Sequence, residues 1–361
     1  MRRALELAKV RKGLTHPNPT VGCVIVKNGK IIGEGFHLKA GSPHAEVVAL
    51  EKAGKAAQGA TVYITLEPCS HYGKTPPCSL ALIQAKVKRV VIATLDSNPK
   101  VAGRGVEMLK RAGIKVDIGI LENEAVKLNE DFFWWITKKI PFVVLKIAQT
   151  LDGFIATLEG KSKWITNELS RKYVHLLRCQ SDAILVGVGT VLKDNPELTV
   201  RNLPCEKQPL RIILDKNLRT PLDAKVLDTS LARTIIFTAS KDSRKIDLIQ
   251  KKGVKVIQTP LDEKNNLNLK WVLKKLGEIE IVQLLVEGGS HIFSSFYEKS
   301  LFNKLFLFVA PKIFGKGISP FKWINPSKIL EEGTLKLINF QRFGNDTLLE
   351  YEPRTPPSVV Y

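Results

Sequence analysis

The feature that most constrains the fold of this chain is the alternation of strand-like and helix-like segments along its first 140 residues. Apolar residues recur at helical spacing in the ranges 3–12, 44–53, 77–86, 105–112 and 122–135. Strand-like runs lie at 23–26, 31–35, 61–66, 89–95 and 115–118, and Asn28-Gly29 between the first two is a strong signal for a β-hairpin turn. This order predicts a layered α/β domain.

A second α/β domain is predicted after the step Lys138-Lys139-Ile140-Pro141, where polar residues lead into a helix breaker. We therefore divide the chain of 361 residues into domains 1–140 and 141–361. Strands are predicted at 142–148, 183–188, 210–214, 234–237, 254–257, 281–286, 305–309 and 347–351. Because no helices follow the last of these strands, we expect a mixed sheet.

Composition restricts the class of protein. The sequence is 44% apolar and 25% charged, which is typical of a folded globular chain. No apolar run approaches the roughly 20 residues of a membrane-spanning helix, and the N-terminal segment has helical periodicity rather than the pattern of a signal peptide. We expect a cytoplasmic protein with no membrane partner. Five scattered cysteines do not suggest a disulfide framework, so we expect reduced thiols, two of them on a metal.

The formal net charge of +20 has three possible meanings: a nucleic-acid partner, an anionic small substrate or a lysine-rich solvated surface. The lysines are spread along the chain in pairs such as Lys138-Lys139 and Lys251-Lys252, without a long basic block. This distribution favours the solvated surface, although charge alone does not decide.

The strongest chemical signal lies in three short segments, His44-Ala45-Glu46, Pro68-Cys69 and Cys78. One imidazole and two thiolates can hold a zinc ion and leave its fourth position open, which is the arrangement of hydrolytic zinc sites. Glu46 comes two residues after the histidine at a helix start, so it can move protons beside the metal without binding it. We therefore predict a zinc-dependent base deaminase with Glu46 as its catalytic residue.

The spacing of the two cysteines departs from the usual deaminase signature. That signature has two residues between the cysteines, whereas residues 70–77 intervene here. A bulging loop stiffened by Pro76-Pro77 can return the second cysteine to the metal. A structural zinc site and two unrelated core thiols remain the alternatives.

Other polar residues carry weaker signals. His71, inside the loop between the cysteines, either contacts the substrate or is an ordinary loop residue. Asn18 lies between two prolines and can present its amide to a substrate, although Asn-Pro is also ordinary turn chemistry. No ligand spacing is seen for the remaining histidines, for which we expect structural roles: His16, His37, His175 and His291.

Longer motifs run through both domains. The first contains THPNPTVGCVIV, PHAEVVAL and TLEPCSHYGKTPPC, and the second contains LKIAQTLDGFIA, SKWIT, DAILVGVGTVLKDNPELTVR, RIILD and LLVEGG. In this order they resemble the family of bifunctional riboflavin-biosynthesis deaminase/reductases over nearly the whole chain. The long loop between the cysteines is characteristic of that family.

The resemblance implies two reactions on one pathway intermediate. An N-terminal cytidine-deaminase-like three-layer domain, holding one zinc ion, removes the 2-amino group of 2,5-diamino-6-ribosylamino-4(3H)-pyrimidinone 5′-phosphate by hydrolysis. A C-terminal dihydrofolate-reductase-like domain then uses NADPH to reduce the ribosyl side chain to a ribityl chain. The expected partner is thus a small phosphorylated pyrimidine.

The resemblance also implies roles for individual residues. Zinc is held by His44, Cys69 and Cys78, and Glu46 moves protons. The implied substrate contacts of the deaminase are Asn18, His71, Lys74 and Asn98. The implied NADPH contacts are Ala148, Trp164, Thr190, Asp194, Gly289, Ser290, His291, Ile292, Phe293, Ser294 and Ser295. The implied substrate contacts of the reductase are Ser162, Arg178, Leu198, Arg201 and Glu287.

Physical chemistry is consistent with the reductase assignment. A glycine-rich turn at Glu287-Gly288-Gly289-Ser290, between a strand and a helix, can offer backbone N–H groups to a dinucleotide phosphate. A Rossmann domain is excluded, because Leu192 stands where the turn after Gly187-Val188-Gly189 needs a small residue. Lys146 and Asp152 are candidate polar groups for the sugar reduction, and the sequence does not decide which one gives the proton.

Two other functions compete with this interpretation. The positive charge and the zinc motif also suit a tRNA adenosine deaminase with an appended domain, but the second half lacks the basic, aromatic-interleaved pattern that RNA binding favours. A non-catalytic protein with a structural zinc site is the other candidate. We expect a homo-oligomeric enzyme with no nucleic-acid partner.

Overall fold

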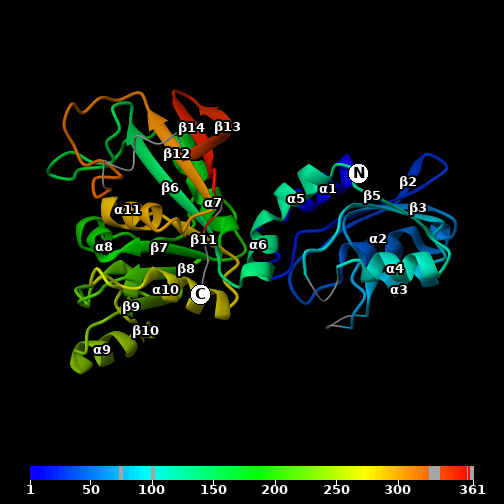
Figure 1. Ribbon diagram of the computed structural model, residues 1–361, viewed down its shortest axis with the longest axis horizontal. Helices are drawn as coiled ribbons and strands as arrows, with labels where there is room; N and C mark the ends of the chain where they lie inside the picture. Colours follow the sequence, from blue (N-terminus) through cyan, green and yellow to red (C-terminus); the bar gives the residue numbers. More distant parts are fainter. Residues whose placement is uncertain (73–75, 99–101, 325–333, 356, 358–361) are drawn as a thin grey trace. The chain divides into compact units, whose positions relative to one another are not determined.

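The structure is a computed structural model that describes residues 1–72, 76–98, 102–324, 334–355 and 357. It divides into two compact units, Met1–Lys139 and Ile140–Tyr361, which are described separately below (Figure 1). No helix among the described residues is long and apolar enough to cross a membrane.

The first unit is built on a five-stranded sheet in the order β2-β1-β3-β4-β5. Strand β1 is antiparallel to β2 and β3, whereas β3, β4 and β5 run parallel. The strands are β1 (Gly22–Lys27), β2 (Lys30–Phe36), β3 (Thr61–Leu66), β4 (Arg89–Thr94) and β5 (Lys115–Ile118). The helices are α1 (Arg2–Lys9), α2 (Ala45–Ala53), the 3-10 turn η1 (Gly54–Ala57), α3 (Cys78–Gln84), α4 (Arg104–Arg111), α5 (Glu122–Leu128) and α6 (Glu130–Lys138).

The predicted hairpin is confirmed at Asn28-Gly29. Both residues have positive φ angles, 51° and 75°, and β1 pairs with β2 on either side of them. A two-residue turn with both central residues at positive φ matches the twist of the flanking strands, and asparagine and glycine tolerate that conformation best.

Glycines in the first two strands let helices approach both faces of this sheet. A Cβ at Gly22 would lie 2.0 Å from the carbonyl oxygen of Ala4 in α1, and a Cβ at Gly35 would lie 2.2 Å from that of Ala45 in α2. Gly35 pairs with Cys23, the neighbour of Gly22, and successive residues of a strand face opposite sides. Helices α1 and α2 therefore cover opposite faces, with α5 beside α1 and α3 and α4 beside α2 (Figure 1). This is the predicted three-layer arrangement.

The second unit contains a nine-stranded sheet in the order β10-β9-β8-β7-β11-β6-β12-β14-β13. Its strands are β6 (Phe142–Thr150), β7 (Ala183–Gly187), β8 (Leu210–Leu214), β9 (Thr234–Thr238), β10 (Lys255–Gln258), β11 (Gln283–Val286), β12 (Lys304–Ala310), β13 (Leu335–Phe343) and β14 (Asp346–Pro353). Its helices are α7 (Glu168–Gln180), α8 (Val188–Asp194), the 3-10 turn η2 (Lys225–Leu227), α9 (Ser243–Gln250), α10 (Leu269–Glu278) and α11 (Ser290–Glu298).

The sheet of the second unit is mixed, as predicted. In the part of the sheet ordered β10-β9-β8-β7-β11-β6-β12, all neighbouring strands are parallel, whereas β14 is antiparallel to both β12 and β13. Every residue of β8 and of β9 is buried, which explains why those strands read as continuous apolar runs. Strand β13 was not predicted from the sequence because it lies at the sheet edge, where most of its side chains are exposed.

Two expectations were wrong. The helix predicted over 122–135 is divided into α5 and α6 at Asn129, whose buried side chain accepts a hydrogen bond from the Thr20 N–H and donates one to the Thr20 carbonyl. The cysteines are not all reduced, because Cys179 at the end of α7 forms a disulfide with Cys205. The fold brings these two residues, 26 positions apart, to a Cα–Cα distance of 6.0 Å, which is within reach of a disulfide.

Candidate active sites

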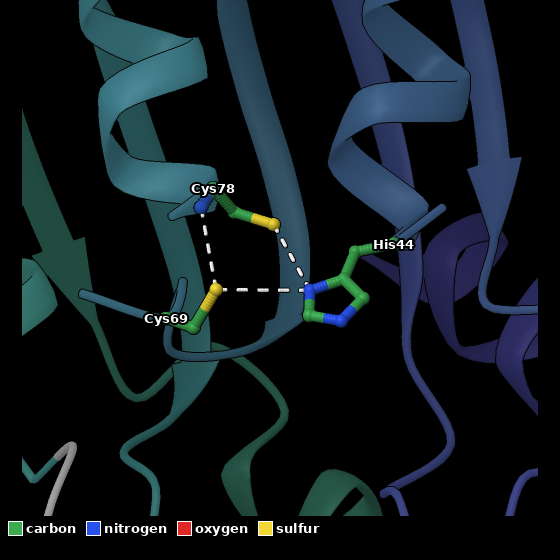
Figure 2. Close-up of side chains that lie close together, drawn as sticks. All are labelled: His44, Cys69 and Cys78. Atoms are coloured by element: carbon green, nitrogen blue, oxygen red, sulfur yellow. Dashed lines mark hydrogen bonds between the residues drawn. The ribbon is translucent and has the colours of Figure 1, made fainter. Parts of the chain in front are cut away.

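Three predicted metal ligands meet in the first unit. His44 immediately precedes α2, Cys69 follows β3 within a loop, and Cys78 is the first residue of α3. Figure 2 shows the imidazole and the two sulfur atoms pointing toward one another. The His44 Nδ1 atom lies 3.2 Å from the Cys78 sulfur and 3.7 Å from the Cys69 sulfur, and all three ligand atoms are within 4.8 Å of one another.

These separations fit a tetrahedral zinc ion. Zinc–sulfur bonds of about 2.3 Å and zinc–nitrogen bonds of about 2.0 Å place nitrogen and sulfur ligands about 3.5 Å apart at a tetrahedral angle. The Cys69 sulfur also accepts a hydrogen bond from the backbone N–H of Cys78, at 3.2 Å. Hydrogen bonds from Cys78 and His44 lower the pKa of the Cys69 thiol, and a thiolate is the form that binds a metal.

Glu46 lies beside this cluster without belonging to it. Its side chain is buried, and the burial raises the pKa of the carboxyl to about 7. The nearby Cys69 contributes in the same direction. A carboxyl whose pKa is close to neutral can both accept and release a proton, which is the property a general acid–base group needs.

Asn18 is held by a histidine that the sequence did not single out. The buried His37 ring has a lowered pKa because of burial, so it is neutral. Its Nδ1 lies 3.2 Å from the Pro43 carbonyl oxygen, which can only accept, so Nδ1 carries the proton. Nε2 must then accept from the Asn18 amide Nδ2 at 3.1 Å. The Asn18 side chain is thereby oriented with its carbonyl oxygen left for another partner.

These contacts agree with the structural role expected for His37. Its ring also stacks edge-on against His44, with centroids 5.1 Å apart. The position of His37 between the first strand pair and the metal-binding helix was the only hint in the sequence. Its partners, Asn18 and Pro43, lie in two separate turns, and their spacing in the sequence does not predict the contact. Of the other histidines, His16 pairs with Asp131 and none joins the metal cluster among the described residues.

The other proposed deaminase contacts lie in two loops. His71 is exposed in the loop between the two cysteines. Asn98 is partly buried in the loop after β4, where its backbone N–H donates to the Asp96 carboxylate at 2.8 Å. Lys74 lies outside the described residues.

In the second unit, a cavity of about 1440 Å³ lies at the carboxyl ends of the central strands. The residues named for the reductase line this cavity. The named cofactor residues that line it are Ala148, Trp164, Thr190, Asp194, Gly289, Ser290, His291, Ile292, Phe293, Ser294 and Ser295. The named substrate residues that line it are Ser162, Arg178, Leu198, Arg201 and Glu287.

The turn before α11 has room and polarity for a phosphate group. A Cβ at Gly289 would meet no atom closer than the Thr190 Oγ1 at 4.0 Å, so the backbone is open to a ligand there. The first N–H groups of a helix lack partners within the helix and attract anions. Ser290, the first residue of α11, is 8% exposed, and its hydroxyl has no hydrogen-bond partner among the described residues. An unsatisfied buried hydroxyl of this kind fits a dinucleotide phosphate.

A buried network of charges lies in the same cavity. Glu287, directly after β11, accepts two hydrogen bonds from the Arg178 guanidinium, at 2.6 and 2.9 Å, and lies 3.4 Å from the Lys146 ammonium on β6. Burial opposes ionisation of Glu287, but Arg178 and Lys146 together lower its pKa to about 2. The carboxylate is therefore ionised, and the network of Glu287, Arg178 and Lys146 has a net charge of one positive unit.

The same cations act on His175 in α7. Burial, followed by the charges of Arg178 and Arg201, lowers the pKa of His175 to about 4. Its Nδ1 accepts the backbone N–H of Arg201 at 3.1 Å. The neutral ring thus holds the backbone of the loop that carries Leu198 and Arg201.

Comparison with known proteins assigns both units to families. Residues 1–94 match the cytidine and deoxycytidylate deaminase zinc-binding region, and residues 141–349 match the RibD C-terminal domain. The chain is 56% identical over 319 residues to riboflavin biosynthesis protein RibD of Aquifex aeolicus, covering 88% of each chain. The chain belongs to the RibD family. A RibD of Actinobacillus pleuropneumoniae is 46% identical and covers 99% of this chain and 95% of its own.

Solved RibD structures share the fold over the whole chain. Acinetobacter baumannii RibD has a TM-score of 0.88 and 40% identity, with 98% of each chain covered. A diaminohydroxyphosphoribosylaminopyrimidine deaminase/5-amino-6-(5-phosphoribosylamino)uracil reductase of Thermotoga maritima has a TM-score of 0.87 and 42% identity, and the match covers 98% of this chain and 97% of that one. The predicted α/β fold class, a cytidine-deaminase-like domain followed by a dihydrofolate-reductase-like reductase domain, is confirmed, and the second domain is the RibD reductase domain.

The structure distinguishes between Lys146 and Asp152, the two polar groups that the sequence analysis left open. Lys146 lines the reductase cavity, whereas Asp152 does not. The Asp152 carboxylate is occupied by the N–H groups of Phe314 and Gly315 and by the Thr150 hydroxyl. Of the two groups that the sequence left open, Lys146 alone lines this cavity.

Proposed function

We propose that this RibD family member catalyses two successive reactions of riboflavin biosynthesis. Residues 1–140 deaminate 2,5-diamino-6-ribosylamino-4(3H)-pyrimidinone 5′-phosphate, and residues 141–361 reduce the ribosyl side chain of the product with NADPH. The observation that carries the proposal is the convergence of His44, Cys69 and Cys78 at zinc-binding distances beside the buried carboxyl of Glu46.

In the deaminase, His44, Cys69 and Cys78 hold zinc. Zinc, when bound, supplies the Lewis acidity that lets water attack an amidine-like ring carbon near neutral pH. Glu46 accepts the protons of that water in turn and delivers one to the ring nitrogen and one to the departing 2-amino group. The C–O bond forms as water adds across the ring C=N bond, and the bond to the 2-amino group then breaks, so one water is consumed and one ammonia is released.

Four side chains are proposed to position the ribotide in the deaminase: Asn18, His71, Lys74 and Asn98. The structure supports Asn18 most directly, because His37 leaves its amide oxygen free to accept a hydrogen bond from the amino-pyrimidinone ring. Lys74 is proposed as a substrate contact from its place in the motif alone, because it lies outside the described residues.

In the reductase, the turn of Gly289 and Ser290 would hold the phosphates of NADPH, and the other cofactor residues named above line the same cavity. NADPH, when bound, supplies a hydride for C1 of the ribosyl group. The C1–O4′ bond of the sugar breaks as the new C–H bond forms, and O4′ then needs a proton. We assign that proton to the Lys146 ammonium, which Glu287 holds at 3.4 Å on the cavity wall.

The substrate end of the reductase is positively charged. The Arg178 guanidinium donates two hydrogen bonds to the Glu287 carboxylate and so fixes its orientation. The carboxylate in turn orients the Lys146 ammonium through their ion pair. Arg201 is 48% exposed and reaches the cavity from the loop after α8, which makes it the cation for the substrate phosphate. Ser162 and Leu198 complete the contacts with the pyrimidine and the sugar.

We further propose a cytoplasmic location, a small phosphorylated pyrimidine rather than nucleic acid as partner, and assembly into a homo-oligomer. Sedimentation equilibrium of the full chain tests the last point directly, since a mass near 40 kDa contradicts it.

The deaminase proposal is tested with ammonia release from the ribotide and from tRNA. We expect release from the ribotide alone, and we expect the Glu46→Gln variant to retain zinc while losing this activity. The matched control is Glu51→Gln, an exposed glutamate of the same helix that lies outside the site. Ammonia release from tRNA alone, or full turnover by Glu46→Gln, contradicts the proposal.

A further inference from the structure

A second buried carboxylate lies close to the metal ligands and has no part in the chemistry proposed above. Glu67 follows β3 directly and comes just before Pro68-Cys69, and it is only 4% exposed. No ion pair joins it to any residue in the described ranges. A buried carboxylate without a cation is costly unless hydrogen bonds satisfy its oxygens.

Backbone N–H groups from two segments supply those hydrogen bonds. The Oε1 atom accepts from Gly105 at 3.0 Å and from Val106 at 3.2 Å, both in the first turn of α4. The Oε2 atom accepts from Gly103 at 2.9 Å and, more weakly, from Asp96 at 3.3 Å. Glu67 therefore contacts the start of α4 with one oxygen and the preceding loop with the other.

The close approach of these segments is built into the sequence. A Cβ at Gly105 would lie 2.0 Å from the Pro68 carbonyl oxygen, so only glycine lets α4 begin against the Glu67-Pro68 segment. If Glu67 served only to cap α4, the hydrogen bonds from Gly105 and Val106 to Oε1 would be sufficient. The contacts to Oε2 lie outside α4 and hold Asp96 and Gly103 to a single oxygen atom.

Asn98 lies between β4 and α4, two residues after Asp96. The Asn98 N–H donates to the Asp96 carboxylate at 2.8 Å, and its carbonyl oxygen accepts from Ala102 at 3.0 Å. Of these two partners, Asp96 is bound directly by Glu67, and Ala102 immediately precedes Gly103, which Glu67 also binds. The main chain of Asn98 is therefore held by residues that depend on Glu67.

We propose that Glu67 is a positioning residue of the deaminase, which holds Asp96 and Gly103 on either side of Asn98 and so places the Asn98 side chain at the substrate. The inference rests on the proposed deamination, because only there is Asn98 a substrate contact. Glu67 itself touches neither the substrate nor a metal ligand side chain in this scheme. Its loss should therefore weaken substrate binding more than it slows the chemical step.

The test uses the full chain with zinc bound and measures kcat and KM for ammonia release from the ribotide. Glu67→Gln keeps the shape of the side chain but leaves one acceptor oxygen where two are needed. We expect KM to rise about five- to tenfold, as for loss of one hydrogen bond, with kcat changed less than about threefold and zinc content unchanged. The control is Glu107→Gln, an exposed residue of α4 paired with Arg111, which should behave as the unaltered chain.

A double-mutant cycle separates positioning from general stabilisation. If Glu67 acts through Asn98, the variant carrying both Glu67→Gln and Asn98→Ala has the same KM as Asn98→Ala alone. The NADPH-oxidation activity of the same chain should not change in any of these variants. Three results overturn the inference: an unchanged KM, effects of the two substitutions that multiply, or a fall in kcat accompanied by loss of zinc.

The outcome also distinguishes this inference from the proposed function. If the unaltered chain releases no ammonia from the ribotide, the deamination itself is wrong. The three overturning results, by contrast, are obtained in an active enzyme and contradict only the role of Glu67.

Discussion

Replacement of Glu287 by glutamine should destabilise the second unit in a pH-dependent way. The substitution removes the negative charge that Arg178 and Lys146 share in the buried network of the reductase cavity. The pKa of Glu287 falls from an ordinary 4.5 to about 2 in the fold, and each pKa unit corresponds to about 1.4 kcal/mol. The resulting value of about 3 kcal/mol agrees with the 3–5 kcal/mol usually lost when one partner of a buried ion pair is removed.

The sign of the pH effect follows from the lowered pKa. The stabilisation is fully present above pH 4.5, where the carboxyl is ionised in both the folded and the unfolded chain, and it is lost as the pH falls toward 2. The difference between the unaltered chain and Glu287→Gln should thus be about 3 kcal/mol at pH 7 and about half of that at pH 3. In hydrogen exchange this corresponds to about 100-fold faster exchange at pH 7 for the most protected amides of β6 and β11.

Hydrogen-exchange mass spectrometry measures this effect separately in peptides of each unit, so that the first unit serves as an internal reference. The control is Glu197→Gln, which breaks an ion pair of similar geometry with Arg201, 2.6 Å long but with both side chains at least 30% exposed. Such a pair is worth about 1 kcal/mol or less. Equal effects of the two substitutions, or a Glu287→Gln effect that does not shrink in acid, would refute the reasoning.

Three further outcomes are expected. Removal of zinc with a chelator should abolish ammonia release but leave NADPH oxidation on the aminouracil ribotide intact, and loss of both activities would contradict independent sites. Lys146→Met should lower the kcat of the reductase by at least about 100-fold, the usual contribution of a general acid, with the dissociation constant for NADPH unchanged in a fluorescence titration. Cys179→Ser should lower the free energy of unfolding of the second unit by about 3 kcal/mol, the value for opening a loop of this length, and a melting temperature equal to that of the oxidised chain would contradict the disulfide.

Local features of the fold were predictable because their causes are local. Asn28-Gly29 specifies its own turn, and β3 and β5 have the bounds that their apolar runs predict. Strand β13 was missed because an exposed edge strand has no apolar run, and its pairing partner β14 follows it in the sequence. The break at Asn129 was missed for a different reason, since it depends on Thr20, more than 100 residues earlier in the chain.

The same distinction applies to the sites. His44, Glu46, Cys69 and Cys78 were identified because the chemistry of a zinc deaminase requires those residue types in that order. The residues that hold the chemical groups in place were not, because hydrogen bonding rather than residue type defines them. Glu67 is an example, since its partners are backbone N–H groups that carry no signature in the sequence.

The disulfide could not be predicted from the number of cysteines in the sequence. Five cysteines in 361 residues do not indicate a scaffold of cross-links, and that inference holds for the chain as a whole. The Cys179–Cys205 pair instead joins the end of α7, next to Arg178, to the segment that follows Arg201. Only the tertiary structure brings these two positions together.

The central claim is that the first unit is a zinc-dependent deaminase whose metal is held by His44, Cys69 and Cys78. Elemental analysis of the purified chain, combined with ammonia release from the diaminopyrimidinone ribotide in the same sample, tests it most directly. The account predicts one zinc per chain, and loss of both zinc and ammonia release in Cys69→Ser with NADPH oxidation preserved. Ammonia release at the full rate by a chain that contains no metal would contradict it.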